Sequence, residues 1–317
     1  MSQNICEYLR EEVINGLYRV PTVRNAFPIW KPIIQNFIGS INATNVINLG
    51  DHLKDIFEST SPVVKDRTQS AVSSAGTAWE SIVCWYLNLC LIGTRTVVIK
   101  HLKPLIPDPM DKAITVMYGN FPSNTESDLI AITFPNNTEY TVTDKYNIAI
   151  KNSQGNLVNT ATASSKFNYK DVIDALVERD FPRTEVGIIQ CKTNWNDNAQ
   201  IPMLWDMVYS STQFVRSNIR VGTSGYDIHD LQKFSYSFVT VPTVKSVINS
   251  TSTCVKRVEN LSGGNYWGKP SQAGIAKALK EIFNNNFKST FSKGGIRPSL
   301  DNELSKLSTE YSYFNII

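Results

Sequence analysis

Residues 186–192 have the sequence VGIIQCK, and the expected fold depends on this stretch. Four apolar or small residues precede Gln, Cys and Lys, and turn-forming residues flank the segment, so we predict a buried strand. Side chains alternate along a strand, which places Gln190 and Lys192 on one side and Cys191 on the other. An unpaired buried charge is costly, so Lys192 at the end of such a strand needs an anionic partner.

A second segment, residues 126–132 with the sequence ESDLIAI, supplies a candidate partner. Two acidic residues, Glu126 and Asp128, lead into an apolar run that predicts another strand. A carboxylate before one strand and a Gln-x-Lys triplet on another indicate a metal and phosphate site.

Asp128 together with Gln190-Cys191-Lys192 resembles the PD-(D/E)xK nucleases, the group that contains most Type II restriction endonucleases. In that family an Asp at one strand and a (D/E)-x-K triplet on the next bind Mg²⁺ and activate water. Position 190 is Gln here, as in a minority of restriction enzymes of the group. The expected Pro before the Asp is absent, although Pro122 lies upstream. The resemblance covers mainly residues 76–192.

The resemblance implies a role for each residue of this motif. Asp128 is expected to be the principal Mg²⁺ ligand, and Gln190 is expected to offer a neutral carbonyl oxygen to the metal or its water. Lys192 is expected to contact the scissile phosphate and the attacking water. Glu126 is a reserve ligand, with a solvated turn carboxylate as its alternative role. One Mg²⁺ ion is expected rather than two.

Glu80 lies in residues 75–92, the clearest helix of the sequence. It shares a helix face with Val83, Cys84 and Leu87, so its carboxylate must be paired, protonated or bound to metal. It resembles the Glu that nucleases of this group often aim at the metal from the helix before the core sheet. The alternative is a buried Glu bonded to the backbone or to an Arg.

Two loops contain candidate DNA-binding residues. Asn194 and Trp195 follow the strand that ends at Lys192, and ligands of α/β sheets collect at the carboxyl ends of strands. An ordinary turn before a helix is the alternative there.

The second loop is residues 261–270, LSGGNYWGKP, which is rich in Gly and lacks the spacing of a nucleotide-binding P-loop. Its Tyr266, Trp267 and Lys269 suit phosphate or base contacts, with a structural corner as the alternative. No nucleotide cofactor is expected.

The predicted fold class is α/β, with a restriction-endonuclease-like mixed β-sheet core flanked by helices. Residues 1–72 are expected to form a helical N-terminal region that Pro21, Pro28 and Pro32 break into short pieces. Residues 73–317 are expected to form the nuclease core, with an inserted β-hairpin and helix at about 135–180 that carries specificity. Strands are predicted at 94–100, 113–118, 129–134, 186–192 and 234–241, and further helices at 169–178, 202–215 and 272–287.

Composition and charge bear on the partner, the cellular compartment and the class of hydrolase. The net charge of +3 permits a nucleic-acid partner without requiring one. Five Cys without a C-x-x-C pair favour reduced thiols, and the N-terminal residues resemble no signal peptide, so a cytoplasmic protein is expected. The longest apolar run, 82–92, is too short to cross a bilayer. Three His without metal-ligand spacing disfavour zinc and His-Asn-His hydrolases.

These observations favour a Mg²⁺-dependent Type II restriction endonuclease that binds double-stranded DNA as a homodimer, since palindromic duplexes match two-fold protein symmetry. One alternative is a non-catalytic DNA-binding protein on a degenerate nuclease fold, for which Gln190 would be the mark. A DNA repair or recombination nuclease is the other.

Overall fold

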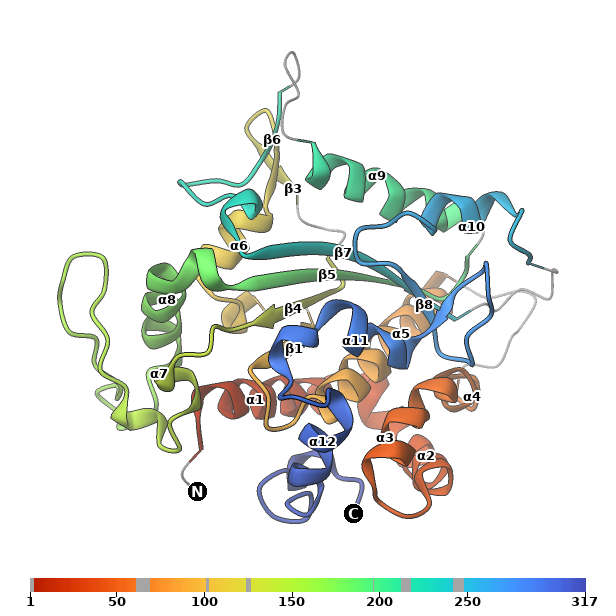
Figure 1. The fold of residues 1–317 in the computed structure, drawn as a ribbon, viewed down its shortest axis with the longest axis horizontal. Coiled ribbons are helices and arrows are strands. Elements are labelled where there is room, and N and C mark those ends of the chain that lie inside the picture. Colours follow the sequence, from red (N-terminus) through yellow and green to blue (C-terminus); the bar gives the residue numbers. More distant parts are fainter. Residues whose placement is uncertain are drawn as a thin grey trace.

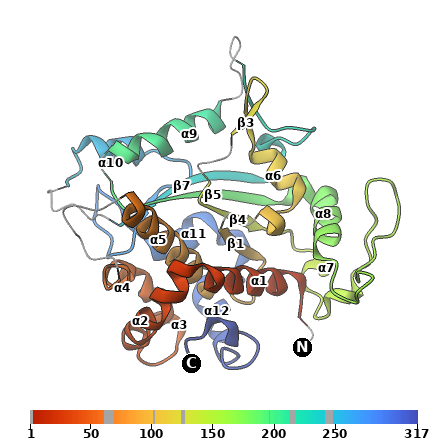
Figure 2. The ribbon, with the colours of Figure 1, turned by 180° about the vertical axis from the view of Figure 1, so that it is seen from behind.

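A computed structural model of the protein describes residues 3–60, 69–100, 103–123, 127–195, 197–211, 218–241 and 248–317. Over these residues the predicted mixed sheet flanked by helices is confirmed (Figure 1). Helix α9 (Gln200–Ser210) runs along one side of the sheet, and helices α1 (Ile5–Arg19) and α5 (Gln69–Cys90) run along the other. Figure 2 shows the same layers from behind.

The main sheet has the strand order β1-β4-β5-β7-β8-β9. Strands β1, β4 and β5 pair antiparallel, whereas β5, β7, β8 and β9 pair parallel. The carboxyl ends of β5, β7 and β8 therefore share one edge of the sheet, and the antiparallel strand β4 begins at that edge. The strands are β1 (Thr96–Lys100), β4 (Leu129–Thr133), β5 (Glu185–Lys192), β7 (Lys233–Thr240), β8 (Asn265–Trp267) and β9 (Lys277–Ala278).

A small antiparallel sheet lies near one end of α9 (Figures 1 and 2). It has the order β3-β2-β6, formed by β2 (Val116–Tyr118), β3 (Phe121–Ser123) and β6 (Ile219–Val221). Val116 and Val221 are buried and join the main hydrophobic core, which anchors the small sheet to the rest of the protein.

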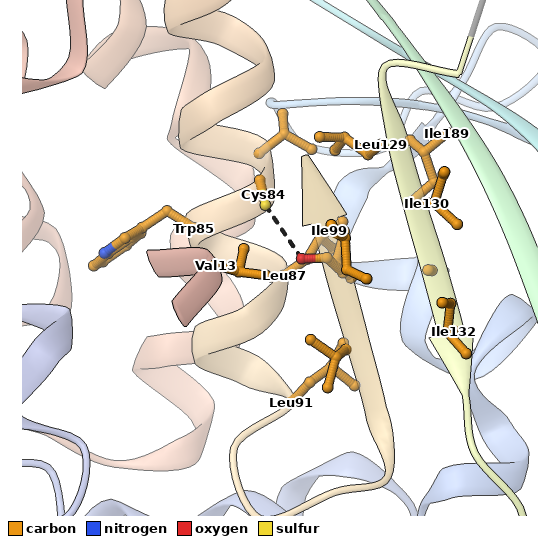
Figure 3. Packing of buried hydrophobic residues seen from close by; sticks show 14 of the residues in the cluster. Val13, Cys84, Trp85, Leu87, Leu91, Ile99, Leu129, Ile130, Ile132 and Ile189 are labelled. Atoms are coloured by element: carbon orange, nitrogen blue, oxygen red, sulfur yellow. Dashed lines mark hydrogen bonds between the residues drawn. The ribbon is translucent and has the colours of Figure 1, made fainter. Parts of the chain in front are cut away.

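The N-terminal helices share one hydrophobic core with the sheet, because buried residues from Ile5 to Ile316 belong to the same cluster. Figure 3 shows part of this core, where Leu87 of α5 lies beside Ile99 of β1. The other helices are α2 (Pro21–Ile38), α3 (Ala43–Asn48), α4 (Leu53–Glu58), α6 (Asp108–Ile114), α7 (Thr138–Thr141), α8 (Tyr169–Asp180), α10 (Thr253–Val258), α11 (Ile282–Asn286) and α12 (Ile296–Leu304).

The expectation that Pro28 and Pro32 break the N-terminal region into short pieces was wrong, because both lie inside one continuous helix, α2. It begins at Pro21 and continues through Pro28 and Pro32 to Ile38. Both internal prolines lie on the exposed side, so the carbonyl groups that lose their helical partner face water. The opposite face packs into the hydrophobic core and stabilises the helix. Its buried residues are Val23, Ala26, Phe27, Trp30, Ile34 and Ile38.

A buried ion pair ties α1 to the core. Arg10 is fully buried, and its Nε donates to Glu7 Oε2 at 3.0 Å. Its remaining N–H groups donate to Asn88 Oδ1 at 3.2 Å and to the carbonyl oxygens of Thr94 at 3.0 Å and Thr96 at 3.1 Å. A buried guanidinium with this many partners is satisfied, so we assign it a structural role.

The insertion at 135–180 contains the predicted helix, α8, but no regular hairpin. Residues around Tyr140 form the short helix α7, because the Tyr140 ring is buried in a stack on Phe134 with centroids 5.1 Å apart. The polar remainder makes only the isolated bridges Lys151↔Leu157 and Ala161↔Phe167. Side-chain bonds to the local backbone compete with a ladder there, as in the bonds that Asn152 Oδ1 accepts from backbone N–H groups.

Three further sequence-based boundaries were wrong. The predicted strand 113–118 is shortened to β2, because Ala113 and Ile114 end helix α6. The predicted helix 272–287 is reduced to α11, preceded by the short strand β9. Residues 288–317, for which the sequence predicts a short helix and a strand, contain helix α12 and no strand. In each case tertiary packing, which the local pattern does not record, sets the boundary.

Candidate active site

Asp128 stands at the sheet edge where β4 begins. The β4–β5 ladder pairs Leu129 with Ile189, which brings Asp128 alongside the last residues of β5. Its Oδ2 accepts a 2.7 Å hydrogen bond from the backbone N–H of Cys191. A charge-assisted bond of this kind fixes the orientation of the carboxylate.

Lys192 ends strand β5 at the same edge. Its Nζ lies 3.7 Å from Asp128 Oδ2, and the two side chains are 24% and 15% exposed. The carbonyl group of Lys192 accepts a hydrogen bond from Thr240 Oγ1 at 2.9 Å, which fastens the end of β5 to β7. Lys192 therefore has the anionic partner that a charge at the end of a buried strand needs, and both side chains remain partly exposed.

Glu80 of α5 is held by a lysine that the sequence analysis did not select. Glu80 Oε2 lies 3.2 Å from Nζ of Lys100, the last residue of β1. The same Nζ donates to the Thr77 carbonyl at 3.2 Å and to Ser81 Oγ at 3.0 Å. Like Lys192, Lys100 is a charged residue at the end of an apolar strand, and that pattern was the available signal.

The thiol of Cys191 lies within the electrostatic influence of three charged residues. Burial raises the pKa of the Cys191 thiol well above its usual value, and the negative charges of Asp128 and Glu80 raise it further. Lys192 acts in the opposite direction. The thiol is therefore neutral at physiological pH.

Gln190 is fully buried, and its Oε1 accepts a hydrogen bond from the Tyr236 hydroxyl at 3.3 Å. The carbonyl oxygen that the resemblance assigns to a metal thus has a partner within the protein. A neutral amide suits this position, because a carboxylate with the same burial would carry a large desolvation penalty. Gln190 therefore has a structural bond that the sequence analysis did not predict.

The oxygen donors at this edge fit the chemistry of Mg²⁺, which binds through one or two carboxylates and retains several waters. Asp128 and Glu80 are the two carboxylates that could hold it. Across the residues that the structure describes, no three His, Cys, Asp or Glu side chains form a metal-binding group. Glu126, the reserve ligand, lies outside the described residues.

Trp195 is a core residue, which corrects its assignment as a DNA contact. Its side chain is fully buried and packs edge-to-face on Trp267, with centroids 5.7 Å apart, and near Phe238 of β7. Asn194 is half-buried beside it. A large apolar ring directly after a buried strand gains more from the core than from the surface, and this was the missed signal.

The 261–270 loop is likewise a packed corner. Tyr266 and Trp267 are buried, so their assignment as DNA contacts is also corrected. Gly268 permits this packing, because a Cβ there would lie 2.8 Å from the Trp79 ring and 2.9 Å from Leu53 Cβ. Lys269 remains partly exposed, with Nζ 4.9 Å above the Trp267 ring, and is the one DNA-binding candidate of this loop that reaches solvent.

Neither a scan against models of protein families nor a search of curated proteins gives a match for this chain. Within the part of the chain that the structure describes, no helix has both the length and the apolar character needed to cross a membrane. The case for function therefore comes from the geometry around Asp128 and Lys192.

Proposed function

We propose that the protein is a Mg²⁺-dependent endonuclease that cleaves double-stranded DNA, of the Type II restriction kind, and that it acts as a homodimer in the cytoplasm. The supporting observation is the approach of Lys192 Nζ to Asp128 Oδ2, 3.7 Å apart, at the ends of two adjacent buried strands. An anionic ligand and a cation at one open sheet edge match the needs of phosphodiester hydrolysis.

Each side chain has a distinct task in this proposal. Asp128 and Glu80 hold the metal ion, and Lys192 contacts the scissile phosphate and orients the attacking water. When bound, Mg²⁺ supplies positive charge to the phosphate and makes a coordinated water more acidic. The hydrogen bond from the Cys191 N–H keeps the Asp128 carboxylate in place, so no reorientation is needed when substrate arrives.

The Glu80–Lys100 pair adds a second cation to the site. Lys100 is 14% exposed and Glu80 is 22% exposed, so neither is sealed in the core. In the proposed enzyme Lys100 neutralises Glu80 before metal binds. Competition between Lys100 and the metal for this carboxylate then sets the metal affinity.

One observation favours a second candidate, a non-catalytic DNA-binding protein on the same scaffold. Gln190, where the related motif carries an acid, bonds to Tyr236 inside the core. A site with two carboxylates instead of three would bind Mg²⁺ more weakly.

The deciding experiment is digestion of a sequenced supercoiled plasmid with Mg²⁺ and with EDTA. Asp128→Ala and Lys192→Met should lower the single-turnover cleavage rate on the order of a hundredfold or more. Lys54→Met is the matched control, because Lys54 is also 24% exposed and ion-paired, at 2.6 Å from Glu58. It should cleave at the wild-type rate.

The products separate the alternatives. Fragment ends at one sequence support a restriction enzyme, whereas scattered ends indicate a repair or recombination nuclease. Plasmid binding without Mg²⁺-dependent cleavage would select the non-catalytic protein. Undiminished cleavage by Asp128→Ala would refute the proposed site.

A further inference from the structure

The pairing of β4 with β5 places the ends of the insertion at 135–180 at the sheet edge opposite to the candidate active site. The insertion leaves the carboxyl end of β4, at Thr133, and returns to the amino end of β5, at Glu185. Those residues pair with each other at the far end of the ladder from Asp128 and Lys192. Five residues of strand span about 17 Å, and Figure 1 shows the insertion beyond that far end. The insertion therefore joins the sheet at the edge opposite to the candidate site.

The β2–β3 hairpin leads instead directly to the site. Phe121 precedes Asp128 by seven residues, so chain length limits their Cα separation to about 25 Å. Tyr118 and Phe121 are register partners that flank the two-residue turn, and their side chains stand side by side on one face. They are 67% and 68% exposed, and among the large hydrophobic residues of the described chain only Leu157 of the insertion, at 67%, is exposed to the same degree.

The charge of the small sheet matches a polyanion. Arg220 of the edge strand β6 is exposed and forms no ion pair with any residue that the structure describes. It pairs with Met117 of β2, so its side chain leaves the face opposite to Tyr118 and Phe121. The nine residues of β2, β3 and β6 include no carboxylate. A protruding ribbon with two aromatic rings on one face and a cation on the other face of its edge strand has the composition expected of a nucleic-acid contact.

We infer that the small sheet β3-β2-β6 is a DNA-contacting element, in which Tyr118 and Phe121 reach the bases and Arg220 meets a phosphate. This inference rests on the proposed function for its choice of duplex DNA. The major groove admits a two-stranded β-ribbon, and the distance limit places the hairpin tip within about seven base pairs of the scissile phosphate. Recognition is thereby assigned to the segment before Asp128 and not to the long insertion.

The test measures binding of a fluorescent random-sequence duplex in metal-free buffer, where the proposed cleavage does not occur. The double variant Tyr118→Ala/Phe121→Ala should bind about tenfold more weakly or worse. Arg220→Ala should also bind more weakly, and the slope of log Kd against log salt should fall by about one. Leu157→Ala is the matched control, since Leu157 is 67% exposed on the insertion, and its affinity should be unchanged.

The outcomes are distinguishable from those of the nuclease test. Wild-type affinity in the double variant would overturn the inference, even if the wild type cleaves plasmid with Mg²⁺. Conversion of a wild-type dimer to a monomer by the double variant, seen by sedimentation, would assign the surface to a second copy and also overturn it. Hairpin-dependent binding without cleavage would support the inference and refute the nuclease. Thermal unfolding checks that each variant is folded.

Discussion

The ammonium group of Lys192 and the carboxylate of Asp128 lie 3.7 Å apart because β5 ends at the sheet edge where the antiparallel strand β4 begins. Their approach depends on the register that pairs Leu129 with Ile189. A slip of one residue would turn Lys192 to the other face of the sheet and separate the charges. The ladder between β4 and β5 therefore positions the candidate site as much as the two side chains do.

Glu80 and Lys100 should change metal affinity in opposite directions. Glu80→Gln removes a carboxylate and should raise the Mg²⁺ concentration for half-maximal cleavage several-fold. Lys100→Met removes the cation that neutralises Glu80 at 3.2 Å, so it should lower that concentration. A Mg²⁺ titration of the cleavage rate, with Lys54→Met as control, measures both. If both variants changed the half-maximal Mg²⁺ concentration in the same direction, the pair would act only through the stability of the fold.

Gln190 should be more important for stability than its place in the motif implies. Tyr236→Phe removes the donor to Gln190 and should lower the free energy of unfolding by about 1 kcal/mol. Gln190→Glu places a carboxyl group at a fully buried position and should cost about 1–3 kcal/mol at neutral pH.

The cost of Gln190→Glu should depend on pH. Burial raises the pKa of a carboxyl group, so the introduced Glu is neutral in acid and charged at neutral pH. The difference from wild type should therefore shrink as the pH falls to about 5. Urea unfolding at both pH values provides the measurement, and a pH-independent difference would contradict a buried carboxylate.

Asp180 should stabilise the fold in a pH-dependent way. It is fully buried and accepts hydrogen bonds from Arg179 Nη2 at 2.6 Å, Asn137 Nδ2 at 2.8 Å and Arg183. Burial opposes ionisation, but the bonds and charges of Arg179 and Arg183 outweigh it and lower the pKa of Asp180 below its usual value.

A lowered folded-state pKa means that this stabilisation is present above the unfolded pKa and is lost as pH falls through the folded pKa. Asp180→Asn should thus cost about 2 kcal/mol at neutral pH. The cost should decline below about pH 3.9, the unfolded pKa. Asp230→Asn, at an exposed position, is the control for urea unfolding. A constant difference across this range would mean that charge does not contribute.

The five cysteines should differ sharply in reactivity. Cys6, Cys84, Cys90 and Cys191 are buried, and only Cys254 is partly exposed. Burial raises the pKa of Cys6 and of Cys84 to about 12, which leaves almost no thiolate to react. A thiol reagent should therefore modify one equivalent in the native protein and five after unfolding. Cys254→Ser should abolish the native reaction, and residual modification would show that the core opens.

The sequence alone was sufficient to predict the elements that form the candidate site. The apolar, β-branched runs of β4 and β5 identify buried strands, because this composition suits both faces of a covered sheet. The polar residues at their ends, Asp128 and Lys192, indicate charge at the sheet edge. The face of α5 that carries Glu80 follows from helical periodicity. All of these signals are local in the chain.

Only the tertiary structure decided which residues reach solvent and which end of the sheet each segment occupies. Trp195 and Trp267 look like surface contacts in their polar loops, but the Trp195 ring, from the loop after β5, packs on the Trp267 ring of β8. The antiparallel pairing of β4 with β5 makes the insertion join the sheet at the edge opposite to Asp128, whereas the β2–β3 hairpin precedes Asp128 directly in the chain. The burial of these loop residues and the pairing of the strands arise from contacts between segments far apart in the chain, which the local pattern of residues does not record.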